Sequence, residues 1–289
     1  MTLFEQIFGQ VMHEAENNQV KNEKDYVGDD GLLYCGECGE AKEAALPDEL
    51  KSMFPGKKTR PRMCRCDRER ADMEEKAERE QQAKNRIDAL RSDGLYSELY
   101  KKCRFENDDR RDERGSRIAM NYAEHFDEYA QCEAGLMFWG NVGTGKSYLA
   151  ACIANALIDR YYTVIMAPLQ TLVADMTENY NENRDAVLAR VENADLLIID
   201  DLGVERSTDY MLEHVFDLIN TRYLAKKPMI VTTNLSPAQL KEDTDLRKVR
   251  VYDRLEEMCQ PIKIGGESRR KAIGKEKTEL FRRILAAGE

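Results

Sequence analysis

Hydrophobic residues in the second half of the chain form short continuous runs that alternate with segments of helical spacing. Four runs have the length of buried strands, at residues 135–139, 163–167, 196–199 and 229–232. Behind the first run, and again between the last two, apolar residues recur every three or four positions, as at Leu149, Ile153 and Leu157. Short apolar strands that alternate with helices predict a parallel sheet covered by helices on both faces. We therefore expect an α/β domain in this part of the chain.

The first third of the chain has different patterns. Residues 1–20 place apolar side chains at helical spacing, which predicts a short amphipathic helix that either caps its own domain or docks on a partner. Residues 67–93 are almost uninterrupted charge of both signs, which predicts an exposed helical linker with little core of its own. We therefore expect an N-terminal module over residues 1–66, a charged linker over 67–94 and the α/β domain over 95–289.

Composition narrows the classes of protein that fit. The 289 residues are 42% hydrophobic and 34% charged, without an apolar stretch as long as a membrane span and without a visible secretory signal. We expect a cytoplasmic protein with no membrane partner. The formal net charge of −10 disfavours tight autonomous binding to duplex DNA, although basic residues cluster modestly between residues 247 and 271. Eight cysteines in such a protein favour free thiols or a metal over a disulfide framework.

The turn after the first strand carries a complete phosphate-binding loop, G-x-x-x-x-G-K-[ST]. Its residues are Gly140, Asn141, Val142, Gly143, Thr144, Gly145, Lys146 and Ser147. A strand before it and a helix behind it are the context that the motif needs, because backbone N–H groups at a helix N-terminus bind phosphate. Lys146 is expected to reach the β- and γ-phosphates of ATP, and the Ser147 hydroxyl to ligate Mg²⁺. The alternative is a glycine-rich turn without a ligand.

Polar side chains follow two later strands. Asp200 and Asp201 end the run at 196–199, and Asn234 follows the run at 229–232. Asp200 is expected to hold the Mg²⁺ shell, and Asp201 to orient and deprotonate the attacking water. Many such enzymes have Glu where Asp201 stands, so slow hydrolysis is expected. Asn234 either hydrogen-bonds the γ-phosphate or water, or only forms a turn.

Two close cysteine pairs lie in the N-terminal module, at Cys35 and Cys38 and at Cys64 and Cys66. Four thiolates at this CxxC and CxC spacing can form a closed tetrahedral Zn²⁺ site of structural type. A metal cross-link would also stabilise a segment with few large hydrophobic residues. Free thiols, a redox pair and an iron–sulfur cluster stay open as alternatives.

Together these features resemble the AAA+ ATPases, in particular the DnaC/DnaI-type bacterial helicase loaders and their IstB-type transposition relatives. The matching stretches are Cys103–Asn107, Gly140–Ser147, Leu196–Gly203, Thr232–Asn234, Arg250–Leu255 and Gly266–Arg270. The resemblance implies that Arg254 is an arginine finger acting on a neighbouring subunit's nucleotide, with self-association through the ATP site. It also implies that Arg269 or Arg270 makes a sensor-2-like contact with nucleotide, although the family has Tyr where Arg269 stands.

The resemblance further implies an ATP-dependent loader of the hexameric replicative helicase onto single-stranded DNA, with the N-terminal zinc module holding the helicase. A helper ATPase of DNA transposition is the first alternative, because it shares the same ATP site. A zinc-dependent nucleic-acid adaptor with a purely structural ATP site and a small-molecule kinase are further alternatives. The segment from Gln170 to Arg190 follows the second strand and is a candidate for lining the DNA path.

Overall fold

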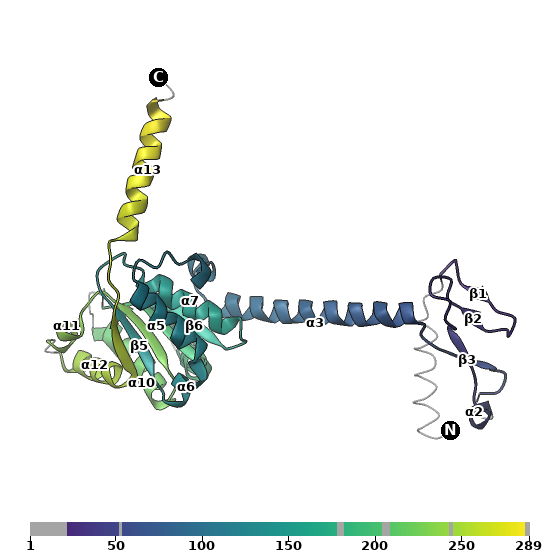
Figure 1. The fold of residues 1–289 in the computed structure, drawn as a ribbon. Coiled ribbons are helices and arrows are strands. Elements are labelled where there is room, and N and C mark those ends of the chain that lie inside the picture. Colours follow the sequence, from purple (N-terminus) through teal and green to yellow (C-terminus); the bar gives the residue numbers. More distant parts are fainter. Residues whose placement is uncertain (1–21, 52–53, 178–181, 204–208, 243–244, 287–289) are drawn as a thin grey trace. The chain divides into compact units, whose positions relative to one another are not determined.

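The computed structural model describes residues 22–286 except 52–53, 178–181, 204–208 and 243–244, together with helix and strand positions whose side chains it leaves undescribed. The chain divides into two compact units, one ending at Lys84 and the other beginning at Asn85. Each unit is described by itself (Figure 1). The amphipathic helix expected over residues 1–20 lies outside the described residues.

The first unit is built from two small antiparallel hairpins. Strands β1 (Tyr26–Val27) and β2 (Leu33–Tyr34) form one, and β3 (Glu43–Ala45) and β4 (Thr59–Pro61) form the other. The short helix α2 (Asp48–Lys51) lies between β3 and β4 in the sequence. Lys42 of the first unit is buried, and its Nζ pairs with the carboxylates of Asp25 at 2.9 Å and of Asp67 at 3.4 Å. The centre of this unit therefore contains a buried lysine paired with two carboxylates and few large apolar side chains.

Helix α3 (Arg65–Gly94) forms over the charged segment, as predicted. Most of its side chains are exposed, but Ile87 and Leu90 near its end pack against the hydrophobic core of the second unit. A Cβ on Gly94 would lie 1.9 Å from the carbonyl oxygen of Val164, so only glycine allows this close approach. The end of the helix therefore contributes more to the core than the charge pattern indicates.

The second unit contains a five-stranded parallel sheet in the order β6-β7-β8-β5-β9. The four predicted runs form β5 (Gly135–Trp139), β6 (Val164–Pro168), β7 (Leu196–Leu202) and β8 (Met229–Thr233). The edge strand β9 (Cys259–Lys263) was not predicted, since its sequence Cys-Gln-Pro-Ile-Lys has no continuous apolar run. Pro261 is tolerated there because an edge strand leaves one row of its hydrogen-bonding groups unused.

Helices cover both faces of this sheet, as expected for the α/β class. Side chains of α5 (Glu113–Glu124), α6 (Phe126–Gln131) and α7 (Lys146–Ile158) form one hydrophobic cluster with the sheet. Side chains of α8 (Leu169–Thr177), α9 (Glu182–Asn193), α10 (Asp209–Leu224) and α12 (Leu246–Met258) form the other. Neighbouring strand residues alternate between the two clusters, as with Leu197 and Ile198, because successive side chains of a strand point to opposite faces.

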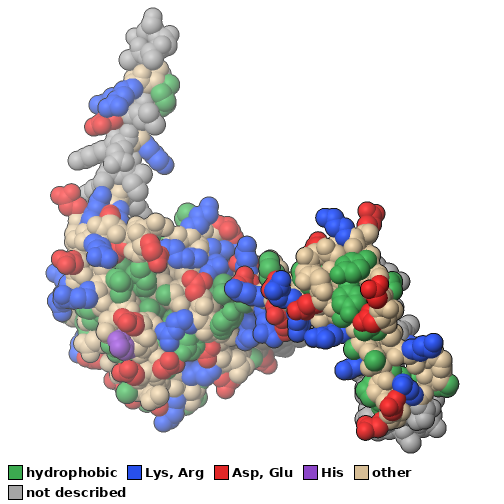
Figure 2. All heavy atoms as spheres, turned by 45° about the vertical axis from the view of Figure 1, so that its right-hand side comes forward, with side chains coloured by type: hydrophobic (Ala, Val, Ile, Leu, Met, Phe, Trp, Pro, Cys, Tyr) green, Lys and Arg blue, Asp and Glu red, His purple; other side chains and the backbone are tan. Residues whose placement is uncertain are grey.

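The remaining helices of the described residues are α4 (Glu98–Lys101), α11 (Pro237–Lys241) and α13 (Arg269–Ala286), and a 3₁₀ turn covers Phe105–Asn107. Among the described helices, none is both long and apolar enough to span a bilayer. Acidic and basic side chains are interspersed over the face of the second unit seen in Figure 2.

A buried arginine of α10 links two strand beginnings. Arg222 is fully buried and donates hydrogen bonds to the carbonyl oxygens of Val191, Ala194, Asp195 and Pro228, at 2.7–3.1 Å. Burial lowers the pKa of its guanidinium to about 10. The first three carbonyls precede β7 and the fourth precedes β8. Arg222 thus ties together the beginnings of the two strands whose opposite ends carry Asp200 and Asn234.

Candidate functional site

The phosphate-binding loop connects β5 to α7, as the sequence predicts. Gly143 and Gly145 have φ angles of 83° and 107°, in the region that glycine adopts without strain. Gly145 caps the helix, so the first backbone N–H groups of α7 face the loop. These groups, with the helix dipole, form the anion-binding arrangement expected for the phosphates of a nucleotide.

A pocket opens at this loop. Its lining residues come from the loop, from the ends of β7 and β8 and from the start of α13, and they are Val142, Gly143, Gly145, Lys146, Ser147, Tyr148, Asp200, Asp201, Asn234 and Arg269. The structure thereby brings together most of the predicted nucleotide-site side chains. Because the carboxyl ends of β5, β7 and β8 meet at one sheet edge, residues about a hundred positions apart share the pocket.

Lys146 is nearly buried, with 6% of its surface exposed. Its Nζ donates hydrogen bonds to the carbonyl oxygens of Gly140 and Asn141, at 2.9 and 2.8 Å, and to Oδ1 of Asn234 at 2.9 Å. The ammonium group is therefore held at the floor of the loop, where it can neutralise phosphate charge. Any phosphate oxygen that binds Lys146 competes with these three oxygens.

Asp200, at the end of β7, is buried and held from both sides. Thr232 Oγ1 donates to its Oδ1 at 2.6 Å, and Tyr100 Oη donates to its Oδ2 at 2.7 Å. Burial and the nearby negative charge of Asp200 raise the pKa of Tyr100, which keeps the phenol protonated as a donor. Asp200 and Ser147 both line the pocket and offer the oxygen ligands that Mg²⁺ prefers. Sequence reasoning missed Tyr100, because a single tyrosine in α4 has no local signature.

Asp201 has a φ angle of 62°, which is unusual for a residue other than glycine. The pairing register of β7 and β8 shifts between Ile199 and Leu202, next to this residue. Its backbone N–H donates to Thr232 Oγ1 at 2.9 Å, and its Oδ1 accepts from Asn234 Nδ2 at 3.0 Å. The carboxylate is exposed to the pocket, where it can reach a water molecule.

Arg269 begins α13 and returns to the phosphate-binding loop. Its backbone N–H donates to the Gly143 carbonyl oxygen at 2.9 Å, and its guanidinium pairs with Asp108 and Asp109. Its Nε is buried and has no hydrogen-bond partner among the described residues, while the residue itself lines the pocket. Sequence reasoning missed the two aspartates. The side chain of Arg270, the alternative contact, lies outside the described residues.

Arg254, on α12, is not among the residues that line the pocket of its own chain. Its guanidinium lies over the ring of Phe216, 4.5 Å from the ring centre, and 5.5 Å from that of Tyr223. Both rings belong to α10, so a cation–π contact fixes the direction of the arginine. Its assignment to a neighbouring subunit's nucleotide stays a prediction.

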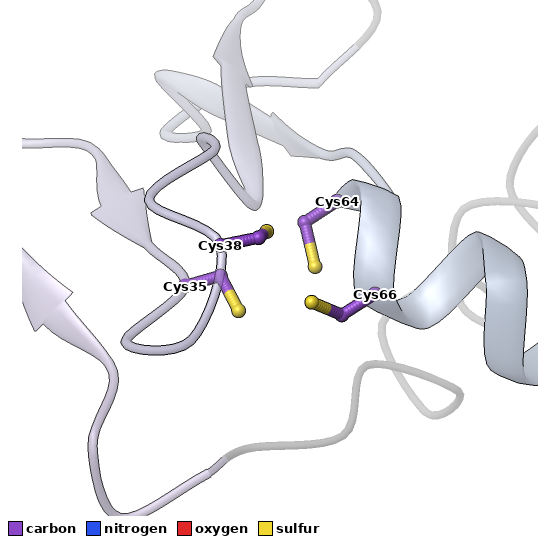
Figure 3. A group of neighbouring side chains, drawn as sticks. All are labelled: Cys35, Cys38, Cys64 and Cys66. Atoms are coloured by element: carbon purple, nitrogen blue, oxygen red, sulfur yellow. The ribbon is translucent and has the colours of Figure 1, made fainter.

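The four cysteines of the first unit lie together (Figure 3). Cys35 and Cys38 lie on the loop between β2 and β3, and Cys64 and Cys66 lie at the start of α3. Their sulfur atoms are all within 4.8 Å of one another. A tetrahedral Zn²⁺ with Zn–S bonds of about 2.3 Å separates its sulfurs by roughly 3.8 Å, so this arrangement fits zinc.

The four thiols of this cluster differ in their pKa values. Backbone hydrogen bonds from Cys66 and Glu40 lower the pKa of Cys38 to about 6, which favours its thiolate form. Burial raises the pKa of Cys64 to about 12, and the hydrogen bond with Cys38 raises that of Cys66 to about 11, so these two thiols lose their protons only when a metal binds. Among the described residues, no other group of His, Cys, Asp or Glu forms a candidate metal site.

The segment from Gln170 to Arg190 corresponds to α8 and α9. Residues 178–181, which include Asn179, Tyr180 and Asn181, lie outside the described residues. The candidate DNA path there stays a prediction.

Curated relatives are similar in sequence to part of this chain. The replicative helicase loader DnaC of Escherichia coli K12 is 31% identical over 161 residues, which are 54% of this chain and 64% of the relative. The replicative helicase loader DnaI of Bacillus subtilis is 25% identical over 171 residues, which are 54% of this chain and 55% of the relative. The chain therefore matches less than two thirds of the length of either loader.

Solved structures share the fold. A crystal structure of DnaI superposes with a TM-score of 0.51 at 24% identity, over 61% of this chain and 95% of the other. The five-stranded parallel sheet flanked by helices is thus a fold that this chain shares with DnaI. A sequence model of the family described as "IstB-like ATP binding protein" matches residues 74–277, which include the whole nucleotide pocket. The chain therefore belongs to the IstB-like ATP-binding protein family.

Proposed function

We propose that this protein is an ATP-dependent loader of the hexameric replicative DNA helicase onto single-stranded DNA. The observation that carries the proposal is a pocket lined by the phosphate-binding loop and by two strand-end acids, in a chain that is 31% identical to a replicative helicase loader over 161 residues. The residues that line this pocket support the ATP-dependent part of the proposal. The relatives are named replicative helicase loaders, and we propose a replicative helicase and single-stranded DNA as the partners of this chain, in the cytoplasm.

The pocket supports ATP binding and slow hydrolysis. Lys146 binds the phosphates, Ser147 and Asp200 hold Mg²⁺, and Asp201 with Asn234 orients water for attack. Mg²⁺ supplies neutralisation of charge on the β- and γ-phosphate oxygens. Asp201 is one methylene shorter than glutamate and is held by Asn234, which limits its reach toward water. Modest turnover suits a protein in which the nucleotide acts as an assembly switch.

Self-association would complete the site. Arg254 is directed by two aromatic rings and lies away from the pocket of its own chain, as a group acting on a neighbouring subunit must. A guanidinium that pairs with phosphate stabilises the charge that develops during transfer. We propose that hydrolysis depends on this contact between protomers and releases the loader.

The first unit is proposed to be a zinc module that binds the helicase. The sulfur cluster supports Zn²⁺ as a structural ion, and the zinc would cross-link the β2–β3 loop to the start of α3. The proposed division is a module over residues 1–66, a helical linker over 67–94 and an ATPase domain over 95–289.

A helper ATPase of DNA transposition is the second candidate, favoured by the IstB-like family that the chain belongs to. Both candidates use the same ATP site, so the partner distinguishes them. Size-exclusion chromatography with light scattering, on the full chain mixed with the replicative helicase of the same source, tests the partner. A complex that depends on ATP is the result expected of a loader. No complex under any nucleotide condition would contradict the loader, and a transposase would then be tested in the same way.

The ATP site itself is tested by Lys146→Ala. Loss of an ammonium group with three oxygen partners at the loop is expected to abolish ATP binding, measured by isothermal titration. Lys227→Ala is a matched control, because that lysine bonds carbonyl oxygens of Asn193 and Ala194 away from the pocket. Full affinity in Lys146→Ala would refute the nucleotide site.

A further inference from the structure

The hydroxyl group of Tyr100 makes a contact to a pocket residue that sequence reasoning missed. It comes from the short helix α4 and lies 2.7 Å from Oδ2 of Asp200, one hundred residues later in the chain. Tyr100 does not line the pocket, so it acts on the site only through Asp200. We propose that Tyr100 is a positioning residue, whose hydroxyl fixes the orientation of the Asp200 carboxylate for Mg²⁺–ATP.

The carboxylate needs two donors to be fixed in this way. A carboxylate has two oxygens and can rotate about the bond that joins it to Cβ, so a single hydrogen bond leaves the other oxygen free to turn. Thr232 holds Oδ1 from β8 and Tyr100 holds Oδ2 from α4. Each oxygen keeps further lone pairs for a metal ion or its water ligands. With both donors in place, Asp200 presents these lone pairs to the pocket in one orientation.

The backbone of Tyr100 is itself held from the core. The fully buried amide of Asn155, on α7, donates through Nδ2 to the carbonyl oxygen of Tyr100 at 2.8 Å and to that of Cys103 at 3.0 Å. The Oδ1 of Asn155 accepts from Nε of Arg91, on α3, at 3.0 Å. Arg91 also pairs with Asp159 at the end of α7. Hydrogen bonds thus link Arg91 of α3 through Asn155 to the backbone of Tyr100, and the side chain of Tyr100 reaches the Asp200 carboxylate.

This path explains why a tyrosine suits the position. A hydroxyl at the end of an aromatic ring reaches from α4 to Oδ2 of Asp200, while the backbone of the tyrosine stays bonded to Asn155 of α7. The phenol is a donor to Asp200 and brings no negative charge of its own. Hydrogen-bond partners of metal-ligating groups typically change metal affinity by about 10–100-fold when they are removed. The inference rests on the proposed nucleotide function of the pocket.

The test is the Mg²⁺ dependence of ATP binding in the full chain carrying Tyr100→Phe. We expect the Mg²⁺ concentration for half-maximal binding of a fluorescent ATP analogue to rise about tenfold, and affinity in EDTA to stay unchanged. Tyr122→Phe is the matched control, since its hydroxyl is buried and donates to the Ala134 carbonyl oxygen away from the pocket. Both variants lose one tyrosine hydrogen bond, so they separate positioning from stability.

A double variant sharpens the result. In an Asp200→Asn background, adding Tyr100→Phe is expected to cause no further shift in Mg²⁺ dependence, because the carboxylate that the hydroxyl positions is gone. A Tyr100→Phe titration that superimposes on the wild type would overturn the positioning role and leave the ATP site intact. A wild-type chain that binds no ATP would instead overturn the proposed function and, with it, this inference.

Discussion

The side-chain oxygen Oδ1 of Asn234 lies 2.9 Å from Nζ of Lys146. The amide nitrogen of the same side chain donates to Asp201 at 3.0 Å. One asparagine at the end of β8 therefore connects Lys146 of the glycine-rich loop with the acid proposed to act on water. The amide oxygen of Asn234 faces the positive Lys146 and its amide N–H faces the negative Asp201, which fixes the orientation of the amide.

Replacing this amide is expected to separate binding from hydrolysis. Asn234→Ala leaves Lys146 two carbonyl partners in the loop, so ATP binding is retained, while Asp201 loses its orienting donor and kcat falls by roughly 100-fold. Asn234→Asp places a carboxylate beside Lys146 that competes with phosphate, and we expect it to weaken ATP binding more than alanine does. Titration calorimetry and steady-state phosphate release measure the two effects. Equal kcat in wild type and Asn234→Ala would exclude a role of the amide in turnover.

Arg254→Ala is expected to leave ATP binding by the single chain unchanged, because Arg254 does not line its own pocket. The increase of ATPase activity per protomer with protein concentration should disappear, since the neighbouring active site loses its guanidinium. Arg250→Ala is the control, as an exposed arginine one turn earlier on α12. Concentration-dependent activity that survives in Arg254→Ala would count against an arginine acting between subunits.

Cys35→Ser combined with Cys38→Ser is expected to release zinc and to unfold only the first unit. Half of the tetrahedral ligand set is lost, and a module with few large apolar side chains depends on its metal. Elemental analysis of the purified protein measures the zinc, and ATP titration measures the second unit, which should bind normally. Cys132→Ser, an exposed cysteine outside the cluster, should keep one zinc per chain. A wild-type protein purified without zinc would contradict the site.

The start of the second unit can be tested by two truncations. A protein beginning at Asn85 keeps Ile87, Leu90 and Arg91, whereas one beginning at Leu95 loses them. Loss of two half-buried side chains and a bonded guanidinium lowers the free energy of unfolding by about 3 kcal/mol. We expect the melting temperature of the shorter protein to be roughly 5–10 °C lower. Identical melting curves would show that the end of α3 adds nothing to the core.

Sequence reasoning located the nucleotide pocket because its parts have local signatures. Lys146 and Ser147 belong to a contiguous motif, and Asp200 and Asn234 each end an apolar run. Parallel strands bring such ends to one sheet edge whatever the distance along the chain. The sheet was predicted for the same reason, apart from β9.

The residues that were missed have partners chosen by tertiary packing. Tyr100 meets Asp200 across one hundred positions, and Asp108 meets Arg269 across 161. Neither pair leaves a periodic pattern, because periodicity reports which face of an element is buried and not what it touches. The sequence did carry one signal, since α4 immediately precedes the Cys103–Asn107 stretch that matches the AAA+ pattern.

Arg222 offers a route to a conditional variant of this protein. Its guanidinium donates to four carbonyl oxygens at the sheet edge opposite the pocket, so removing it deprives these buried acceptors of their charged donor. Losses of this kind amount to about 3–5 kcal/mol, a large part of the 5–15 kcal/mol by which domains are typically stable. Arg222→Met is therefore expected to be active in the cold and inactive when warmed, with a lowered melting temperature by circular dichroism. A cell carrying this temperature-sensitive allele could be switched off at a chosen moment, without altering any residue that touches ATP.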